Sequence, residues 1–186
     1  MARTESKMLA LGTKAPSFSL WDTVSGTKLD LQRTTGTKGT VIMFICNHCP
    51  FVKHVNPEIS KLAKDYQAKG IGFIAISSND IVNYPQDNPE LMKITAREAG
   101  YTFPYLYDDT QEVARAYDAA CTPDFYLFDA ALKLVYRGQL DDSRPENGIP
   151  VTGKDLRVAM DALLTGNPIT TDQKPSIGCN IKWKTK

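Results

Sequence analysis

The feature that most constrains this chain of 186 residues is an apolar segment, residues 40–45, that leads directly into Cys46-Asn47-His48-Cys49. A continuous run of β-branched and aromatic residues is typical of a strand buried on both faces, in a sheet covered by helices. Apolar residues then recur every three or four positions across residues 51–66, which predicts an amphipathic helix. The cysteine pair therefore falls where a buried strand ends and a helix begins, the place at which catalytic groups gather in open α/β sheets.

The rest of the chain alternates predicted strands with predicted helices. A turn signal at Ser25-Gly26 between two short apolar segments predicts an N-terminal hairpin. The alternation in the first half predicts parallel strands joined by right-handed crossovers, and the last two strands predict a second hairpin. Beyond the segments already named, strands are expected at residues 71–76, 103–107, 124–128 and 133–137, and helices at residues 89–99, 111–118 and 153–164.

These elements predict an α/β fold with a central mixed sheet flanked by helices. We expect one domain over residues 1–186, with a core at about residues 12–165. The tail, residues 166–186, has no regular pattern, but it carries Ile177, Ile181 and Trp183. We expect this irregular tail to dock on the body and to bury the indole of Trp183.

Charge and composition exclude several classes of partner. The formal net charge is +1, so no bulk attraction to nucleic acid or to an anionic membrane is expected. No apolar stretch approaches the roughly 20 residues of a spanning helix, and the apolar run within residues 1–15 is too short for a signal peptide. Four cysteines are too few for a disulfide scaffold. The sequence therefore predicts a cytoplasmic protein with no nucleic-acid or membrane partner.

The position of the cysteine pair predicts reactivity. Free backbone N–H groups and the helix dipole at such a junction stabilise a thiolate, so we expect the pKa of Cys46 to lie below the value of about 8.5 of a free thiol. Cys49 lies one helical turn further on and can close a disulfide with Cys46. His48 adds positive charge and makes the pair more oxidising, while Pro50 at the first helical position costs little. A structural pair without chemistry is the plainer alternative.

A metal site is the competing interpretation of the same residues, since Cys46, Cys49, His48 and His54 offer four donors. However, His48 stands between the two cysteines, and His54 lies five residues beyond Cys49 along the predicted helix. A tetrahedral site from these four is awkward, and the chain has no second Cys-x-x-Cys motif. We therefore expect no metal ion and no other cofactor.

Three residues outside the motif have two interpretations each. Cys121 is either a small buried apolar residue or a third thiol that traps Cys46 or Cys49. Cys179 either packs with the tail or acts as a distal resolving thiol, if the tail docks near the pair. Arg144 is either a solvated loop residue or a positive charge that lowers the pKa of the thiolate.

The motifs together resemble the thioredoxin superfamily, and within it the peroxiredoxin-like branch of the alkyl-hydroperoxide-reductase/thiol-specific-antioxidant type. The resemblance covers nearly the whole chain. It depends on three segments: Ala15-Pro16-Ser17-Phe18-Ser19-Leu20, the strand that runs into Cys46-x-x-Cys49-Pro50, and Thr122-Pro123-Asp124-Phe125-Tyr126-Leu127-Phe128-Asp129.

The resemblance implies a thioredoxin-like fold and a role for each site residue. Cys46 would be the exposed nucleophile and Cys49 the resolving thiol. Pro123 would form a cis peptide bond beside the disulfide, and the Thr122 backbone would be free to pair with an incoming peptide. Cys121 would then lie close to the pair.

Departures from the family pattern favour one reaction over another. Ile45 stands where thioredoxins commonly have tryptophan, and residues 41–45 lack the buried carboxylate that thioredoxins keep there. The Pro-x-x-x-Thr/Ser-x-x-Cys loop of the peroxidase branch is also missing. The sequence therefore predicts a thiol–disulfide oxidoreductase with a potential between about −270 and −180 mV.

Two alternatives stay open at this point. One is a peroxiredoxin-like thiol peroxidase that reduces hydroperoxides and protects against oxidants, and the other is a non-catalytic redox sensor or binding module. The expected partners are protein or small-molecule disulfides and thiols, hydroperoxides in the peroxidase case, and an upstream thiol reductant.

Overall fold

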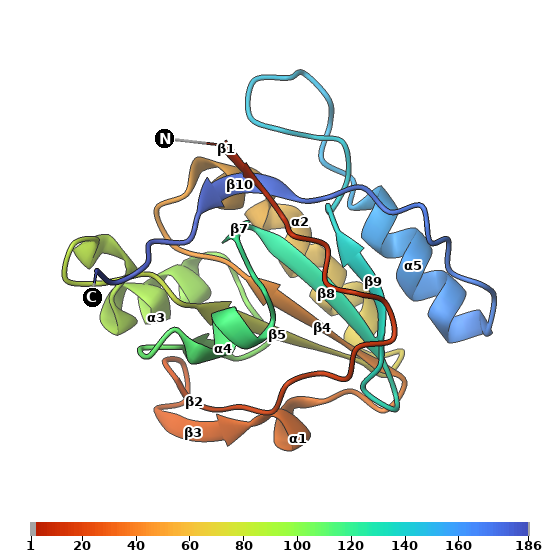
Figure 1. The fold of residues 1–186 in the computed structure, drawn as a ribbon, viewed down its shortest axis with the longest axis horizontal. Coiled ribbons are helices and arrows are strands. Elements are labelled where there is room, and N and C mark those ends of the chain that lie inside the picture. Colours follow the sequence, from red (N-terminus) through yellow and green to blue (C-terminus); the bar gives the residue numbers. More distant parts are fainter. Residues whose placement is uncertain (1–2, 186) are drawn as a thin grey trace.

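A computed structural model describes residues 3–185 of the chain. At its centre is a seven-stranded mixed sheet in the order β3-β2-β6-β5-β4-β8-β9 (Figure 1). Strands β4, β5 and β6 run parallel, whereas β8 runs antiparallel to β4 and forms a hairpin with β9. The strands of this sheet are β2 (Ser19–Asp22), β3 (Thr27–Asp30), β4 (Gly39–Phe44), β5 (Ile71–Ser77), β6 (Tyr105–Tyr107), β8 (Asp124–Asp129) and β9 (Leu134–Gly138).

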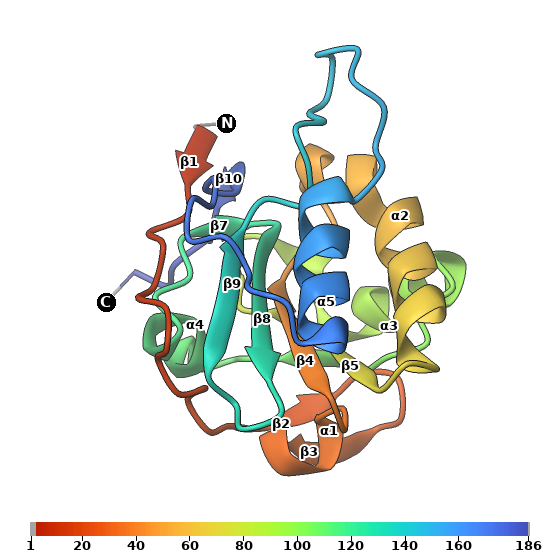
Figure 2. The same cartoon turned by 90° about the vertical axis from the view of Figure 1, so that its right-hand side faces the viewer.

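Helices cover both faces of the sheet, as Figure 2 shows. Three of them, α2, α3 and α5, contribute buried residues to the apolar core on one face, and α1 and α4 contribute to the core on the other. The helices are α1 (Leu31–Thr34), α2 (Pro50–Gln67), the 3₁₀-helix η1 (Pro85–Asp87), α3 (Pro89–Glu98), α4 (Glu112–Ala116) and α5 (Lys154–Thr165).

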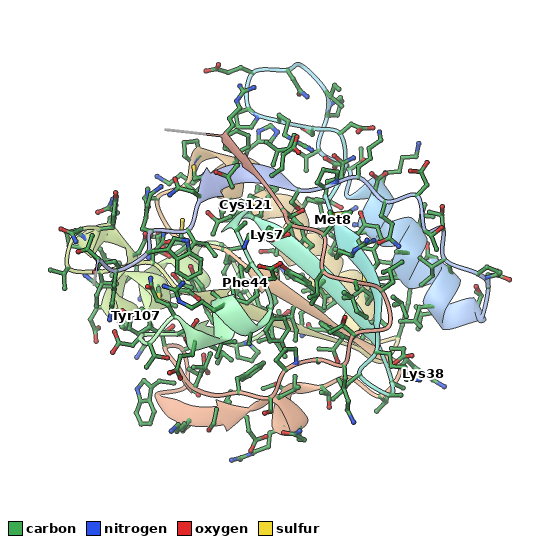
Figure 3. All side chains as sticks on the ribbon, viewed as in Figure 1. Lys7, Met8, Lys38, Phe44, Tyr107 and Cys121 are labelled. Atoms are coloured by element: carbon green, nitrogen blue, oxygen red, sulfur yellow. The ribbon has the colours of Figure 1, made fainter. Side chains whose placement is uncertain are left out.

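Strand β4 shows why a continuous apolar run is needed at the centre. Val41 and Met43 point into the core beneath α2, while Ile42 and Phe44 point into the core on the opposite face. All four are at most 1% exposed, and Phe44 lies deep among the packed side chains (Figure 3). Because successive side chains of a strand alternate between faces, only a strand without polar interruptions fills both cores.

The C-terminal tail forms part of a second, three-stranded sheet in the order β1-β10-β7. Its strands are β1 (Arg3–Glu5), β7 (Cys121–Thr122) and β10 (Ile177–Asn180), all antiparallel. The expected docking of the tail is confirmed, but the expectation that it is irregular is wrong over these four residues. Trp183 is half-buried, with the guanidinium carbon of Arg115 4.3 Å from its ring centroid.

The predicted fold class, both hairpins and the parallel central strands are confirmed. Helix α2 continues without a break through Pro57. Nothing observed tests the expected single domain, which stays a prediction. Within residues 3–185, every helix is too short or too polar to cross a bilayer.

Candidate active site

The cysteine pair lies at the junction that the sequence predicted. Strand β4 ends at Phe44, Cys49 is the N-cap residue of α2, and Pro50 occupies the first turn of that helix. Both thiols are buried, with Cys46 2% exposed and Cys49 not exposed at all. The expectation of an exposed nucleophile is therefore wrong for this conformation, because the Thr122-Pro123 turn and His48 lie against Cys46.

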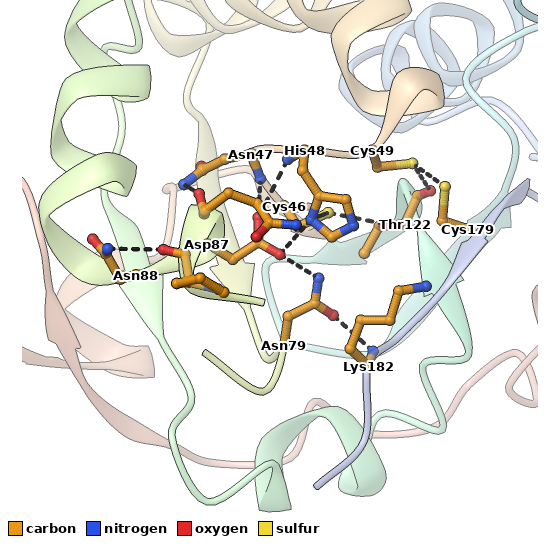
Figure 4. A network of polar contacts seen from close by, with 12 residues as sticks. Cys46, Asn47, His48, Cys49, Asn79, Asp87, Asn88, Thr122, Cys179 and Lys182 are labelled. Carbon is orange, nitrogen blue, oxygen red and sulfur yellow. Dashed lines mark hydrogen bonds and ion pairs between the residues drawn. The ribbon is translucent and has the colours of Figure 1, made fainter. Parts of the chain in front are cut away.

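Cys46 lies between a hydroxyl group and an imidazole ring (Figure 4). Its Sγ is 3.5 Å from Thr122 Oγ1 and 3.9 Å from His48 Nδ1. The same ring nitrogen of His48 is 2.6 Å from Asp87 Oδ2, and the ring stacks on Tyr84. His48 is thus fixed beside the sulfur, and the Asp87 carboxylate contacts the same ring nitrogen.

Asp87 is the functional residue that sequence reasoning missed. It is fully buried, and besides His48 it accepts hydrogen bonds from the side chain of Asn79 at 2.8 Å and from the backbone N–H of Asn47 at 2.8 Å. Burial alone would raise the pKa of this carboxyl, but the hydrogen bonds from His48, Asn79 and Asn47 outweigh it and hold the pKa below its ordinary value. The Asp87 carboxylate is therefore a fixed negative charge next to Cys46.

The pKa values of the two thiols are shifted in opposite directions. The hydrogen bond from Cys46 lowers the pKa of Cys49 to about 5, against the effect of burial, and the Cys179 thiol and the backbone of Val52 assist. The pKa of Cys46 is raised, first by that shared hydrogen bond, then by burial and by the charge of Asp87. The expectation of a lowered pKa at Cys46 is therefore wrong, because the interaction with Cys49, burial and the Asp87 charge all raise the pKa of Cys46.

The turn that faces the pair contains a cis peptide bond between Thr122 and Pro123, which confirms what the family resemblance implied. The carbonyl oxygen of Thr122 lies 3.2 Å from Cys49 Sγ. The Thr122 backbone, however, is not free for a peptide, because Thr122 pairs with Cys179 in the antiparallel β7–β10 ladder. The protein's own tail occupies the edge that the resemblance left open.

The tail also brings a third thiol into the site. Cys179 Sγ lies 2.8 Å from Cys49 Sγ, and burial raises the pKa of Cys179 to about 12. Cys121 lies close by, but its thiol donates to the carbonyl oxygens of Pro123 and Ser176, at 3.6 and 3.9 Å. Of the two additional thiols that the sequence suggested, Cys179 is the one in contact with the pair.

The other candidate residues lie elsewhere. The guanidinium of Arg144 donates to Gln139 and to the carbonyl oxygens of Asp141 and Ser143, in the loop that follows β9. His54 Nε2 is 2.7 Å from Ser143 Oγ, so the four-residue metal site considered from the sequence is not assembled. Among the described residues, the set that could hold a metal ion is Cys46, His48 and Asp87, whose donor atoms lie within 4.8 Å of one another.

The fold and this site define a class. A Cys-x-x-Cys pair between a buried strand and a helix, facing a cis-proline turn, is the arrangement of a thioredoxin-like thiol–disulfide oxidoreductase. The protein is therefore an oxidoreductase whose redox pair is Cys46 and Cys49.

Comparison with known proteins gives the family. The AhpC/TSA family matches residues 11–137, and the chain belongs to this family. It is similar to the thiol-disulfide oxidoreductase ResA of Geobacillus thermodenitrificans (strain NG80-2), with 30% identity over 126 residues, which cover 68% of this chain and 67% of that protein.

Two crystal structures resemble the whole chain. One is an uncharacterized conserved protein from Geobacillus kaustophilus, with 62% identity, a TM-score of 0.98, and coverage of 100% of this chain and 98% of that one. The other is a hypothetical protein from Sinorhizobium meliloti 1021, with 46% identity, a TM-score of 0.96, and coverage of 98% and 100%.

Proposed function

We propose that Cys46 meets the substrate disulfide and that Cys49 resolves the resulting mixed disulfide. The observation that carries this assignment is the position of the two sulfurs, because Cys49 caps α2 and is enclosed by the Thr122 carbonyl and by Cys179, whereas Cys46 precedes the helix. Cys46 is also the more exposed of the two and the one beside His48. Cys49 supplies the base, and Cys46 supplies the attacking sulfur.

The reaction then balances as two exchanges. As Cys46 attacks one sulfur of the substrate disulfide, its proton passes to Cys49, the substrate S–S bond breaks and a first thiolate leaves. That thiolate takes the proton from Cys49, and Cys49 attacks the Cys46 sulfur and expels the second substrate thiolate. The substrate gains two electrons, and the pair becomes the Cys46–Cys49 disulfide. An upstream thiol reductant reverses these steps.

The substrate class follows from what surrounds the pair. The β7 edge beside Pro123 is occupied by β10, so strand pairing with an extended peptide is blocked while the tail stays docked. This supports small-molecule disulfides, or a protein disulfide on an exposed loop, as the substrate. We place the protein in the cytoplasm, on the support of its four cysteines and its near-neutral charge.

The test is a redox titration of the Cys46–Cys49 couple against glutathione, combined with reduction of a small-molecule disulfide by the wild type, Cys46→Ser and Cys49→Ser. We expect a midpoint between about −270 and −180 mV. The wild type should turn over, and both variants should not. Equal turnover by Cys46→Ser and the wild type would remove Cys46 from the reaction.

Hydroperoxide reduction is a second candidate, because the chain belongs to the AhpC/TSA family. Stopped-flow mixing with hydrogen peroxide distinguishes it from disulfide exchange. A buried Cys46 with a raised pKa should react no faster than a free thiol, since the thiolate is the nucleophile. Much faster oxidation would establish the peroxidase and an antioxidant role.

A further inference from the structure

Strand β10 holds Cys179 against the redox pair. Cys179 lies opposite Thr122 in the β7–β10 ladder, and its sulfur is 2.8 Å from that of Cys49 (Figure 4). The neighbouring Gly178 allows this approach, because a Cβ atom there would stand only 1.9 Å from the carbonyl oxygen of Thr122. The tail therefore touches the cis-proline turn backbone to backbone, and it presents one sulfur to the site.

The tail is anchored on both sides of Cys179. Before it, β10 pairs with β1, and Ser176 exchanges hydrogen bonds with Ser6. After it, the backbone of Lys182 donates to Asn79 Oδ1 at 2.8 Å and accepts from Gln111 Nε2 at 2.8 Å. Because the segment belongs to a sheet and is fixed at both ends, the Cys179 sulfur has a defined position next to Cys49.

Cys49 belongs to two possible sulfur pairs. It shares the Cys-x-x-Cys motif with Cys46, and its sulfur contacts that of Cys179. Thiol–disulfide exchange needs an attacking sulfur in contact with a disulfide sulfur, and Cys179 has that contact with Cys49. Cys121 has no such contact, since its thiol is directed at backbone carbonyl oxygens.

We propose that Cys179 is a third redox thiol. It exchanges with the Cys46–Cys49 disulfide and stores the oxidised state as a Cys49–Cys179 disulfide. The proposal depends on the function above, because the exchange starts from the Cys46–Cys49 disulfide. The Cys179 sulfur attacks the Cys49 sulfur, the Cys46–Cys49 bond breaks, and the Cys49–Cys179 bond forms. Cys46 leaves as a thiolate and takes up the proton that Cys179 loses. The exchange is redox-neutral and requires no further reactant.

The exchange gives the thiols different roles: Cys49 and Cys179 hold the disulfide, and Cys46 is reduced again. The stored disulfide joins two buried sulfurs, on Cys49 and Cys179, and it leaves the Cys46 sulfur outside the bond. Cys46 returns to the thiol form beside His48, ready for a further reaction. The stored disulfide also fastens the tail to the cis-proline turn.

The test uses the full chain with Cys46→Ser, equilibrated with oxidised glutathione, alkylated and digested with trypsin. The digest separates the partners, because residues 39–53 carry Cys46 and Cys49, residues 116–133 carry Cys121, and residues 158–182 carry Cys179. We expect most of the Cys46→Ser protein to contain a cross-link between the first and third peptides. The Cys46→Ser/Cys121→Ser double variant should give the same cross-link, and Cys46→Ser/Cys179→Ser should instead carry glutathione on Cys49.

A Cys46→Ser protein that keeps Cys179 alkylated and carries glutathione on Cys49 would overturn the proposal. The wild type gives an independent measurement should the variants fold poorly. After oxidation by a small-molecule disulfide, it should contain the Cys49–Cys179 cross-link as well as the internal Cys46–Cys49 disulfide. The internal disulfide alone would overturn the relay and leave the proposed function intact, whereas no disulfide of either kind would contradict both.

Discussion

Cys46 and Cys49 are three positions apart in the sequence, yet their surroundings are opposite. Cys46 lies beside the Asp87 carboxylate and the His48 ring, and its pKa is raised. Cys49 caps a helix and contacts Cys179, and its pKa falls to about 5. The comparison shows that the interaction within the Cys-x-x-Cys motif separates the pKa values of the two thiols, and that Asp87 and Cys179, from elsewhere in the chain, add to the difference.

The largest effects should come from removing the sulfurs. Both Cys46→Ser and Cys49→Ser should lower turnover of a small-molecule disulfide at least about 100-fold, because Cys46 makes the first exchange and Cys49 the second. The trapped species should differ. Cys49→Ser should accumulate a mixed disulfide between Cys46 and the substrate, visible as a mass increase. Cys46→Ser should not hold substrate, because Cys179 lies next to the remaining sulfur.

Accumulation of the same mixed disulfide by both variants would mean that the two sulfurs are interchangeable, and the comparison would fail. Cys121→Ser is the matched control, since Cys121 is also buried but is directed at backbone carbonyl oxygens. It should turn over as the wild type does.

A substitution in the C-terminal tail should change how easily a reagent reaches Cys49. Gly178→Ala places a Cβ atom 1.9 Å from the Thr122 carbonyl oxygen, so β10 must shift. We expect a loss of about 1–3 kcal/mol in the free energy of unfolding, measured by chemical denaturation, and faster alkylation of Cys49. Gly148→Ala is the control: its Cβ atom meets open space, so it strains only its own backbone, at φ +72°, and should leave the alkylation rate unchanged. Unchanged alkylation in Gly178→Ala would show that the tail does not shield the site.

The pKa of Cys46 can be changed by replacing the neighbouring carboxylate of Asp87. Asp87→Asn removes a negative charge that raises the pKa of Cys46, so that pKa should fall, as measured in alkylation profiles. The control Asp109→Asn, an exposed partner of Lys184, should not change it. A profile for Asp87→Asn that matches the wild type would mean that the Asp87 charge does not act on Cys46.

A smaller effect concerns acid stability. The pKa of Asp87 is lower in the folded protein than its ordinary value of 3.8, so its ionised form stabilises the fold above pH 3.8. This contribution is lost as the pH falls through the folded pKa. The stability difference between the wild type and Asp87→Asn should therefore shrink below pH 3.8, as measured by denaturation at several pH values. A difference that stays constant through this range would show that the carboxylate gains nothing from its charge.

The sequence predicted the parts of the site that are local. The apolar run before Cys46 and the helical pattern after Cys49 placed the pair correctly, because burial and periodicity are encoded residue by residue. Ile177, Ile181 and Trp183 revealed that the tail docks. The cis bond at Pro123 came from the family resemblance.

The long-range parts could not be predicted. Asp87 reaches Asn47 across 40 residues, and it stood in the sequence as one acidic residue within a polar loop. Cys179 meets Cys49 across 130 residues, and a four-residue strand is too short to give an alternating pattern. Both contacts depend on how loops and edges close over the site, which composition and spacing do not encode.

The ultraviolet absorbance of the thiolate as a function of pH, in the reduced wild type and in Cys46→Ser and Cys49→Ser, shows directly which sulfur carries the charge. We expect a thiolate that forms in the wild type with a midpoint near pH 5, persists in Cys46→Ser, whose hydroxyl can still donate to Cys49, and disappears in Cys49→Ser. A low-pH thiolate that persists in Cys49→Ser and vanishes in Cys46→Ser would place the charge on Cys46 and contradict this expectation.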